Sequence, residues 1–142
     1  MSLNEEKPAL GRARIRKISL VIVNRVRENP TADSRVRLIE KLVQEQYPDS
    51  RLTLKELARQ ANISIWHLAR VFKSHTGASI KQYLRAVRMT KAKELLLTTT
   101  LSIKEVAAAV GHNHVSDFDH HFKATFQMRP GEFRRVRGKN PQ

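Results

Sequence analysis

The chain has 142 residues, which allows one domain or two small domains that share a connecting helix. Lysine and arginine together number 27 against 13 aspartate and glutamate residues, and the net charge of +14 favours a polyanionic partner, either nucleic acid or an anionic membrane surface. The absence of cysteine excludes disulfides and thiolate chemistry, and the lack of a signal peptide or a long apolar run predicts a cytoplasmic protein without a membrane anchor.

Residues 1–33 are interpreted as a basic N-terminal extension or linker. Within it, the segment 12–28 places isoleucine and valine on one helical stripe with basic residues elsewhere, which predicts a helix. The same richness in β-branched residues also suits a strand, so both structures stay open for this segment. The dipeptide Asn29-Pro30 ends it.

Residues 34–78 have the rhythm of a first helix-turn-helix subdomain. A helix is predicted over 34–46 because its apolar residues recur on one face. The T-x-x-E sequence at 53–56 is a capping box, in which a side-chain oxygen accepts from an orphan backbone N–H, and it opens a short helix. A second short helix is predicted over 64–74, and Gly77 suits its left-handed end.

Residues 79–97 are predicted to form one uninterrupted connecting helix, because apolar residues recur there at three- and four-residue steps. Ser79 and Gln82 form an S-x-x-Q capping box at its start, and the threonines at 98–100 disfavour its continuation. At about 1.5 Å per residue the helix would be roughly 28 Å long. Arg88 lies among the apolar residues, which favours a structural hydrogen bond for its side chain.

Residues 98–137 repeat the pattern as a second helix-turn-helix subdomain, followed by a tail at 138–142. The S-x-x-E box at 102–105 opens one helix, and an S-x-x-D sequence at 116–119 is predicted to cap the next. Pro130 suits the start of a last short helix. Because they recur at helical spacing, four phenylalanines are predicted to belong to the core: Phe72, Phe118, Phe122 and Phe126.

The two subdomains are related as a degenerate internal repeat. Each has a small residue where its two helices cross and, four positions later, a residue that tolerates positive φ. These residues are Ala58 and Asn62 in the first copy and Ala107 and Gly111 in the second. The interval from the turn residue to the first buried residue of the next helix is one position longer in the second copy, so its turn is predicted to contain one extra residue.

In order and spacing, these segments resemble the DNA-binding domain of the AraC/XylS family of bacterial transcription regulators. The matching stretches, within about 34–137, are LTLKELARQANISIWHLARVFKSHTG, YLRAVRMTKAKELL, LSIKEVAAAVG and the pattern F-x-x-x-F-K-x-x-F-x-x-x-P over 118–130. The resemblance implies an all-α fold of two helix-turn-helix subdomains joined by one long central helix. It also implies recognition helices over 65–73 and 117–125.

The function implied by this resemblance is sequence-specific regulation of transcription through double-stranded DNA, without enzymatic activity and without a cofactor. RNA polymerase is a further implied partner, and it stays open whether an effector-sensing domain, absent from this chain, belongs to a longer regulator. Two successive major grooves on one face of DNA lie about 34 Å apart, which a helix of roughly 28 Å and its flanking subdomains can span. Bending the DNA would close any shortfall at a cost of about 1–6 kcal/mol.

Within the first subdomain, the stretch SIWHLAR at 64–70 is most similar to small, MarA-like members of the family. In those proteins the positions of Trp66 and Arg70 contact bases and backbone, so the resemblance implies these roles here. Arg70 can pair bidentately with a guanine edge, and Trp66 can cover a thymine methyl group or a sugar. Ala69 stands where those proteins have glutamine, so that base contact is missing. The candidate DNA-binding residues of this subdomain are Ser64, Ile65, Trp66, His67, Arg70 and Lys73, with phosphate contacts expected of the last lysine and of His67.

The second subdomain departs from the family, which usually has phenylalanine, glycine and threonine where this chain has His112, Gln127 and Arg129. Asp119 could accept a hydrogen bond from cytosine N4, but as the third residue after Ser116 it more simply caps the helix. Weak or absent base readout by this subdomain is therefore an alternative. The candidate DNA-binding residues at the family's base-reading positions are Val115, Ser116, Asp119 and His120, and Lys123 is a candidate phosphate contact.

Two other classes of function compete with DNA binding. Histidine and aspartate crowd 112–121, superficially like the ligands of a metal-dependent hydrolase, but the ligand spacing fails and no strand precedes them. His120 and His121 would also point about 100° apart on a helix, so they cannot share one ion, and no metal site is predicted. A basic membrane-surface or RNA-binding protein would suit the net charge. RNA modules usually display aromatics from a sheet, whereas the aromatics here fall mostly in the core pattern.

Overall fold

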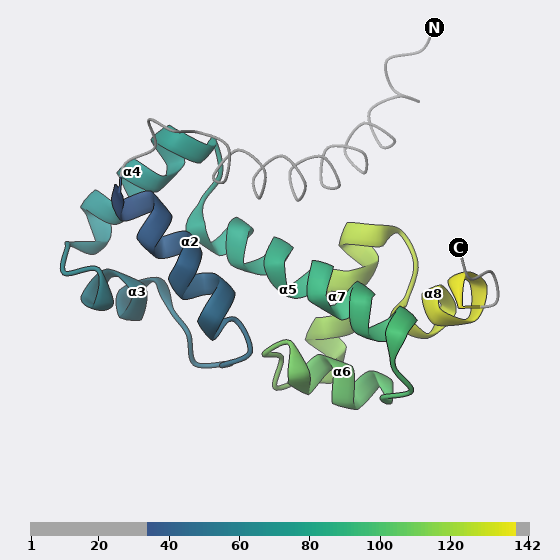
Figure 1. Cartoon of the computed structure of the whole chain (residues 1–142). Helices are drawn as coiled ribbons and strands as arrows, with labels where there is room; N and C mark the ends of the chain where they lie inside the picture. The colour runs from purple at the N-terminus through teal and green to yellow at the C-terminus, as the bar shows by residue number, and fades with distance from the viewer. Residues whose placement is uncertain (1–33, 139–142) are drawn as a thin grey trace, which may run out of the picture.

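The computed structural model describes residues 34–138, and this part of the chain is entirely helical (Figure 1). The all-α fold with one long central helix is confirmed. The segment 12–28 and residues 139–142 lie outside the described range, and so does the structure predicted for them. None of the described helices is long and apolar enough to cross a membrane. In chain order the helices are α2 (Ser34–Gln46), α3 (Leu54–Gln60), α4 (Ile65–Thr76), α5 (Ile80–Thr98), α6 (Ile103–Ala109), α7 (Val115–Phe126) and α8 (Pro130–Arg137).

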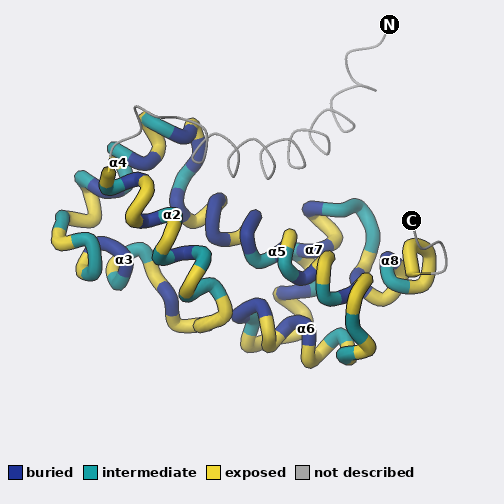
Figure 2. Tube along the Cα trace, viewed as in Figure 1, coloured by how far each residue is buried: buried dark blue, intermediate teal, exposed yellow. Residues whose placement is uncertain are grey.

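Helix α5 supports two groups of helices, α2–α4 at one end and α6–α8 at the other (Figure 1). We call these groups the first and second subdomains. Helix α5 contributes to both cores: Ile80, Tyr83, Leu84 and Val87 belong to the core of the first subdomain, and Met89, Ala92 and Leu96 belong to the core of the second. Figure 2 shows the first turns of α5 largely buried between its neighbours. The uninterrupted helix predicted over 79–97 is confirmed to within one residue at each end.

Each subdomain surrounds its own apolar core. The predicted core phenylalanines Phe72, Phe118 and Phe122 are fully buried, and Phe126 packs against the second core while partly exposed. Burial of one such ring stabilises the fold by about 1.5–3 kcal/mol. The apolar residues predicted at helical steps in this helix are Tyr83, Leu84, Val87, Ala92, Leu95 and Leu96. Three further residues of α5 are buried, because helices pack on α5 from more than one side: Ile80, Ala86 and Met89.

The capping boxes at the starts of α5 and α6 are confirmed. In both, a serine accepts from the backbone N–H three residues later, and the side chain of that later residue accepts from the backbone N–H of the serine. At the start of α3 only half of the predicted box forms. Thr53 accepts from the N–H of Glu56 at 3.2 Å, but the carboxylate of Glu56 binds Arg59 and Gln60 instead. Each such cap contributes about 1 kcal/mol to helix stability.

The capping box predicted at 116–119 is wrong. Helix α7 begins at Val115, its N-cap is His114, and no side chain caps it. Ser116 is therefore already the second helical residue, where its hydroxyl no longer has the geometry of a cap. Helix α7 therefore begins two residues earlier than a cap at Ser116 would place it.

The predicted internal repeat is confirmed in the backbone. Helix α6 begins 49 residues after α3, whereas α7 begins 50 residues after α4, so the second turn contains the one extra residue. Asn62 and Gly111, the two turn residues, have φ of 56° and 91°. In both copies the residue after the turn residue donates its N–H to the carbonyl of the small crossing residue, Ala58 or Ala107.

A junction of backbone and side-chain contacts joins the two subdomains. Arg88, in the middle of α5, donates from Nε to the carbonyl oxygen of Tyr47 at 2.9 Å and from Nη2 to that of Asp49 at 2.8 Å. The structural hydrogen bond predicted for Arg88 is thus confirmed. Gly111 of the second subdomain packs against the same carbonyl of Tyr47 and against the Arg88 guanidinium. The loop after α2, the centre of α5 and the turn after α6 are therefore held together.

Helices α4 and α7 end in the same way, although their capping residues differ. Gly77 and Gln127 both adopt the left-handed conformation, with φ of 78° and 67°, and each donates its N–H to a lysine carbonyl at 2.8 Å. Glycine adopts this conformation without steric cost, whereas a side chain with a Cβ is strained there. The end of α7 therefore carries backbone strain that the end of α4 lacks.

We expect Gln127→Gly to raise the free energy of unfolding by about 0.5–1 kcal/mol, because the strain at positive φ exceeds the added flexibility of the unfolded chain. The hydrogen bond from the Gln127 side chain to the carbonyl of Ala124, at an exposed position, offsets little of this gain. The midpoint of urea unfolding, followed by circular dichroism, measures the change. Gly77→Gln is the matched control and should lose a similar amount. An unchanged midpoint for Gln127→Gly would contradict the strain argument.

Candidate nucleic-acid interface

The start of α4 presents an exposed apolar and basic surface. Ser64 is the N-cap, and its hydroxyl accepts from the backbone N–H of His67 at 3.1 Å, which fixes the first turn. Ile65 is 37% exposed and Trp66 is 85% exposed. Tryptophan is highly buried on average, so a side chain this exposed is an unusual feature of the surface of α4.

Arg70 and Lys73 continue this surface along α4. They follow Trp66 by four and seven residues, so the three side chains share one side of the helix, and both cations are exposed. The opposite side of α4 is buried in the first core through Leu68 and Phe72. Packing of α4 against α2, α3 and α5 therefore directs the predicted recognition residues outward.

His67 differs from these neighbours because its ring contacts another helix. Its Nε2 accepts a hydrogen bond from the guanidinium of Arg35 in α2, and the residue is only partly exposed. A phosphate contact by His67 stays a prediction, and the observed role is to tie the start of α4 to α2.

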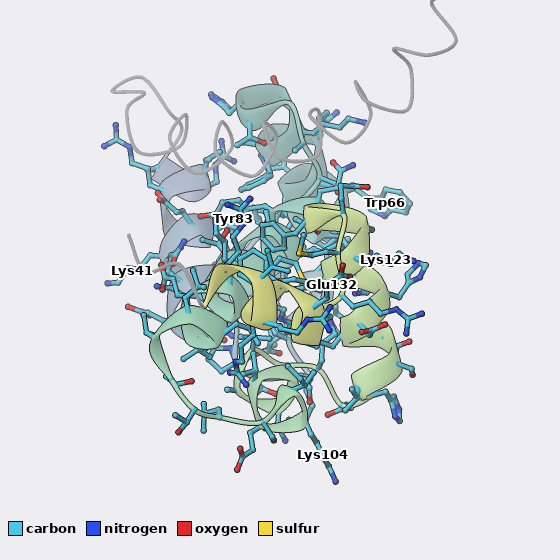
Figure 3. All side chains as sticks on the ribbon, turned by 90° about the vertical axis from the view of Figure 1, so that its right-hand side faces the viewer. Lys41, Trp66, Tyr83, Lys104, Lys123 and Glu132 are labelled. Atoms are coloured by element: carbon cyan, nitrogen blue, oxygen red, sulfur yellow. The ribbon has the colours of Figure 1, made fainter. Side chains whose placement is uncertain are left out.

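The predicted interface residues of the second subdomain lie on α7. Val115, Ser116, His120 and Lys123 are exposed, whereas Asp119 is partly buried. Viewed along the molecule as in Figure 3, Lys123 of α7 projects on the same side as Trp66 of α4, and Lys41 of α2 projects on the opposite side. The exposed surfaces of the two predicted recognition helices thus face one common side.

Asp119 forms an ion pair in place of the predicted cap. Its Oδ2 lies 3.7 Å from Nε of Arg129, the residue immediately before α8. The sequence indicated only that Arg129 departs from the family's pattern, and no contact was predicted for it. The one available signal was that Arg129, which replaces the family's threonine, comes ten residues after Asp119 in the recognition helix.

The histidine-rich segment contains a paired imidazole contact. Nε2 of His112 and Nδ1 of His121 lie 3.2 Å apart, and the ring of His112 packs edge-on against Phe118 with centroids 5.6 Å apart. Burial, together with His121 and Arg88 nearby, lowers the pKa of His112 to about 4, so it is neutral at pH 7. Within residues 34–138 no group of three or more potential ligands could hold a metal ion. His112 therefore fills the apolar place that phenylalanine takes in the family.

Comparisons with known proteins agree with this geometry. A family model described as a helix-turn-helix domain matches residues 57–136. The Msm operon regulatory protein of Streptococcus mutans is 33% identical over 107 residues, which are 75% of this chain and 38% of that protein. The chain thus spans well under half the length of this relative.

Two solved structures share the fold closely. The C-terminal domain of AraT, a response regulator from Geobacillus stearothermophilus, superposes with a TM-score of 0.73 at 35% identity, covering 75% of this chain and 88% of that domain. The DNA-binding domain of AdpA, a global transcriptional factor solved in complex with a target DNA, superposes with a TM-score of 0.70 at 27% identity, covering 75% and 96%. Neither the hydrolase nor the membrane or RNA alternative gains support from any of these matches. The chain belongs to the AraC-type helix-turn-helix family of DNA-binding transcription regulators.

Proposed function

We propose that this chain regulates transcription by placing α4 and α7 in two successive major grooves on one side of a DNA double helix. The observation that supports this proposal most directly is that Trp66 of α4 and Lys123 of α7 project on the same side of the molecule (Figure 3). Both helices pack on α5, whose 19 residues span about 28 Å against a groove repeat of about 34 Å. A modest bend of the DNA brings both grooves within reach.

The residues of the proposed interface divide into two kinds of contact. Trp66 and Arg70 face base edges of the first groove, where an arginine pairs best with guanine. Lys73 and Lys123, at equivalent positions of α4 and α7, face phosphates, and such contacts supply most of the affinity and make it fall steeply with salt. The remaining proposed contacts come from the N-cap of α4 and the first two turns of the two helices: Ser64, Ile65, His67, Val115, Ser116 and His120.

Replacing Arg70 by alanine tests whether the first recognition helix reads sequence. On a duplex selected from a random pool by the wild-type protein, we expect affinity to fall by about 1–3 kcal/mol, while affinity for unrelated duplex changes much less. Fluorescence anisotropy at fixed salt measures both.

Lys73→Ala is the control for this experiment, because it removes one charge from the same side of α4. A phosphate contact carries no sequence information, so its loss should weaken both duplexes alike and lower the salt slope by about 1. Equal losses on both duplexes for Arg70→Ala would instead show that Arg70 is a phosphate contact, and the proposed readout would be wrong.

The same proposal includes the cellular location of the chain and a second partner. We place the activity in the bacterial cytoplasm, where chromosomal DNA is accessible to a protein of this kind. RNA polymerase is the second proposed partner, since a regulator bound beside a promoter changes transcription by aiding or blocking the polymerase. Retention of purified RNA polymerase on a promoter duplex, with and without this chain, measures that effect directly.

A further inference from the structure

Asp119 lies on the side of α7 that faces DNA in the proposed complex. It follows Val115 by four residues and precedes Lys123 by four, and residues at this spacing share one side of a helix. Lys123 projects on the same side as Trp66 (Figure 3). A carboxylate at such a place meets the negative potential of the phosphates, so an acidic residue needs a compensating charge or a donor from the DNA.

Arg129 supplies the compensating charge. Its Nε lies 3.7 Å from Oδ2 of Asp119, and its side chain is 67% exposed against 32% for the aspartate. Arg129 occupies the N-cap position of α8, as Ser79 does for α5 at the equivalent place of the first subdomain. Ser79 caps its helix with its hydroxyl, whereas Arg129 makes no cap, so its side chain turns back to α7 instead.

Stability alone does not account for this pair. A single ion pair at this distance and exposure contributes little or nothing to the stability of the fold. The capping role predicted for Asp119 is also absent, because α7 begins at Val115 and has His114 as its N-cap. The arrangement instead holds an acceptor and a donor-rich cation next to each other on the proposed DNA-binding surface.

We propose, on the basis of the function proposed above, that Asp119 reads a cytosine in the second major groove and that Arg129 is its positioning residue. A carboxylate only accepts hydrogen bonds, and cytosine N4 is an amino donor. Guanine and thymine present acceptors at the corresponding edge and repel a carboxylate. Adenine has a donor at N6, but the acceptor N7 lies beside it, so cytosine is preferred over all three.

Arg129 acts in two ways in this arrangement. Its Nε holds the carboxylate of Asp119 in place and offsets its charge, while the remaining N–H groups of the guanidinium, at the exposed end of the side chain, reach a neighbouring phosphate. The pair is neutral as a whole, so the second subdomain gains base discrimination without losing its attraction to DNA.

Selection from a randomised duplex library tests the inference. The wild-type chain should enrich a site with one cytosine position in the half bound by α7, and replacing that base should weaken binding by about 5- to 100-fold in anisotropy titrations. D119A should abolish the preference at that position and leave the first half-site unchanged. D119N should shift the preference to adenine, because an amide pairs with both N6 and N7.

Variants of Arg129 separate positioning from simple charge. R129A should reduce the cytosine preference and lower the salt slope by about 1, and R129K should restore the slope but only part of the preference. D117N is the control for D119N, because it removes the same negative charge two positions earlier on α7. It should keep the wild-type preference for cytosine.

Three results would overturn this inference. The first uses four duplexes that differ only in the base at the cytosine position. If D119A bound all four more tightly than the wild type by the same factor, Asp119 would be a repulsive group and not a base reader. If the wild-type chain enriched a specific site in which D119A and D119N had the same base preferences as the wild type, the inference would fail while the proposed function stood. Enrichment of no sequence at all would reject both.

Discussion

Gly111→Ala is expected to lower the free energy of unfolding by about 2–5 kcal/mol. Gly111 has φ of 91°, a conformation that costs a residue with a Cβ about 1–2 kcal/mol. The added Cβ would also lie 2.5 Å from the carbonyl oxygen of Tyr47 and 2.9 Å from Nε of Arg88. Neither group can simply move, since the two are hydrogen-bonded to each other, and overpacking of this kind costs about 1–3 kcal/mol. Urea unfolding followed by circular dichroism measures the loss.

Two further glycine variants act as controls for this prediction. Gly131 lies in α8 with no atom within 4 Å of a built Cβ, so Gly131→Ala should leave stability unchanged or raise it by up to about 1 kcal/mol. Gly111→Asn keeps the crowding but relieves part of the strain, because asparagine tolerates positive φ, as Asn62 does in the first subdomain. A wild-type midpoint for Gly111→Asn would show that crowding at the junction is negligible and would contradict our account.

Local sequence signals predicted the helices of this protein well because most of their ends are encoded nearby. Ser79 and Ser102 cap helices with partners three residues away, and Asn62, Gly77 and Gly111 mark turns through their own tolerance of positive φ. Each of these features depends on residue types within a few positions of one another. Periodicity then identified most of the core, since a helix that packs on one side shows its buried stripe directly.

The predictions failed where the decisive partner is distant in sequence. The S-x-x-D pattern at 116–119 has the spacing of a cap, but helix α7 already begins at Val115, and Asp119 pairs with Arg129 ten residues later. The contact between Arg35 and His67 spans 32 residues, and no local pattern indicates it. The periodic pattern also did not predict that Met89 is buried, because α5 packs on helices from both subdomains and is therefore buried on more than one side.

The junction at Arg88 also bears on how DNA is bound. Arg88 binds the carbonyl oxygens of Tyr47 and Asp49, and Gly111 packs against the carbonyl of Tyr47 and the Arg88 guanidinium. These contacts hold the two subdomains in a fixed orientation on α5. In the proposed complex, α4 and α7 would then meet the DNA at one separation only. Binding by the second helix then becomes an intramolecular step with little further entropy to lose, which is the origin of avidity.

Inserting 5 bp between the two half-sites of a selected duplex should reduce affinity by about 10²- to 10⁴-fold, to the level of a duplex with one half-site. Half a turn of DNA moves the second half-site to the opposite face and about 17 Å further along, and a rigid α5 cannot follow. Anisotropy titrations at fixed salt measure the loss, with 5 bp added outside the half-sites as the control.

Inserting 10 bp distinguishes a rigid spacer from a flexible one. The second half-site returns to the original face of the DNA but lies about 34 Å further away, which exceeds the reach of a single α5 helix. We therefore expect no recovery with 10 bp, whereas a flexible linker, or two copies of the chain bound side by side, would recover much of the affinity. Equal binding to the original and the 5-bp duplexes would show that only one recognition helix contacts DNA, and the proposed two-groove complex would be wrong.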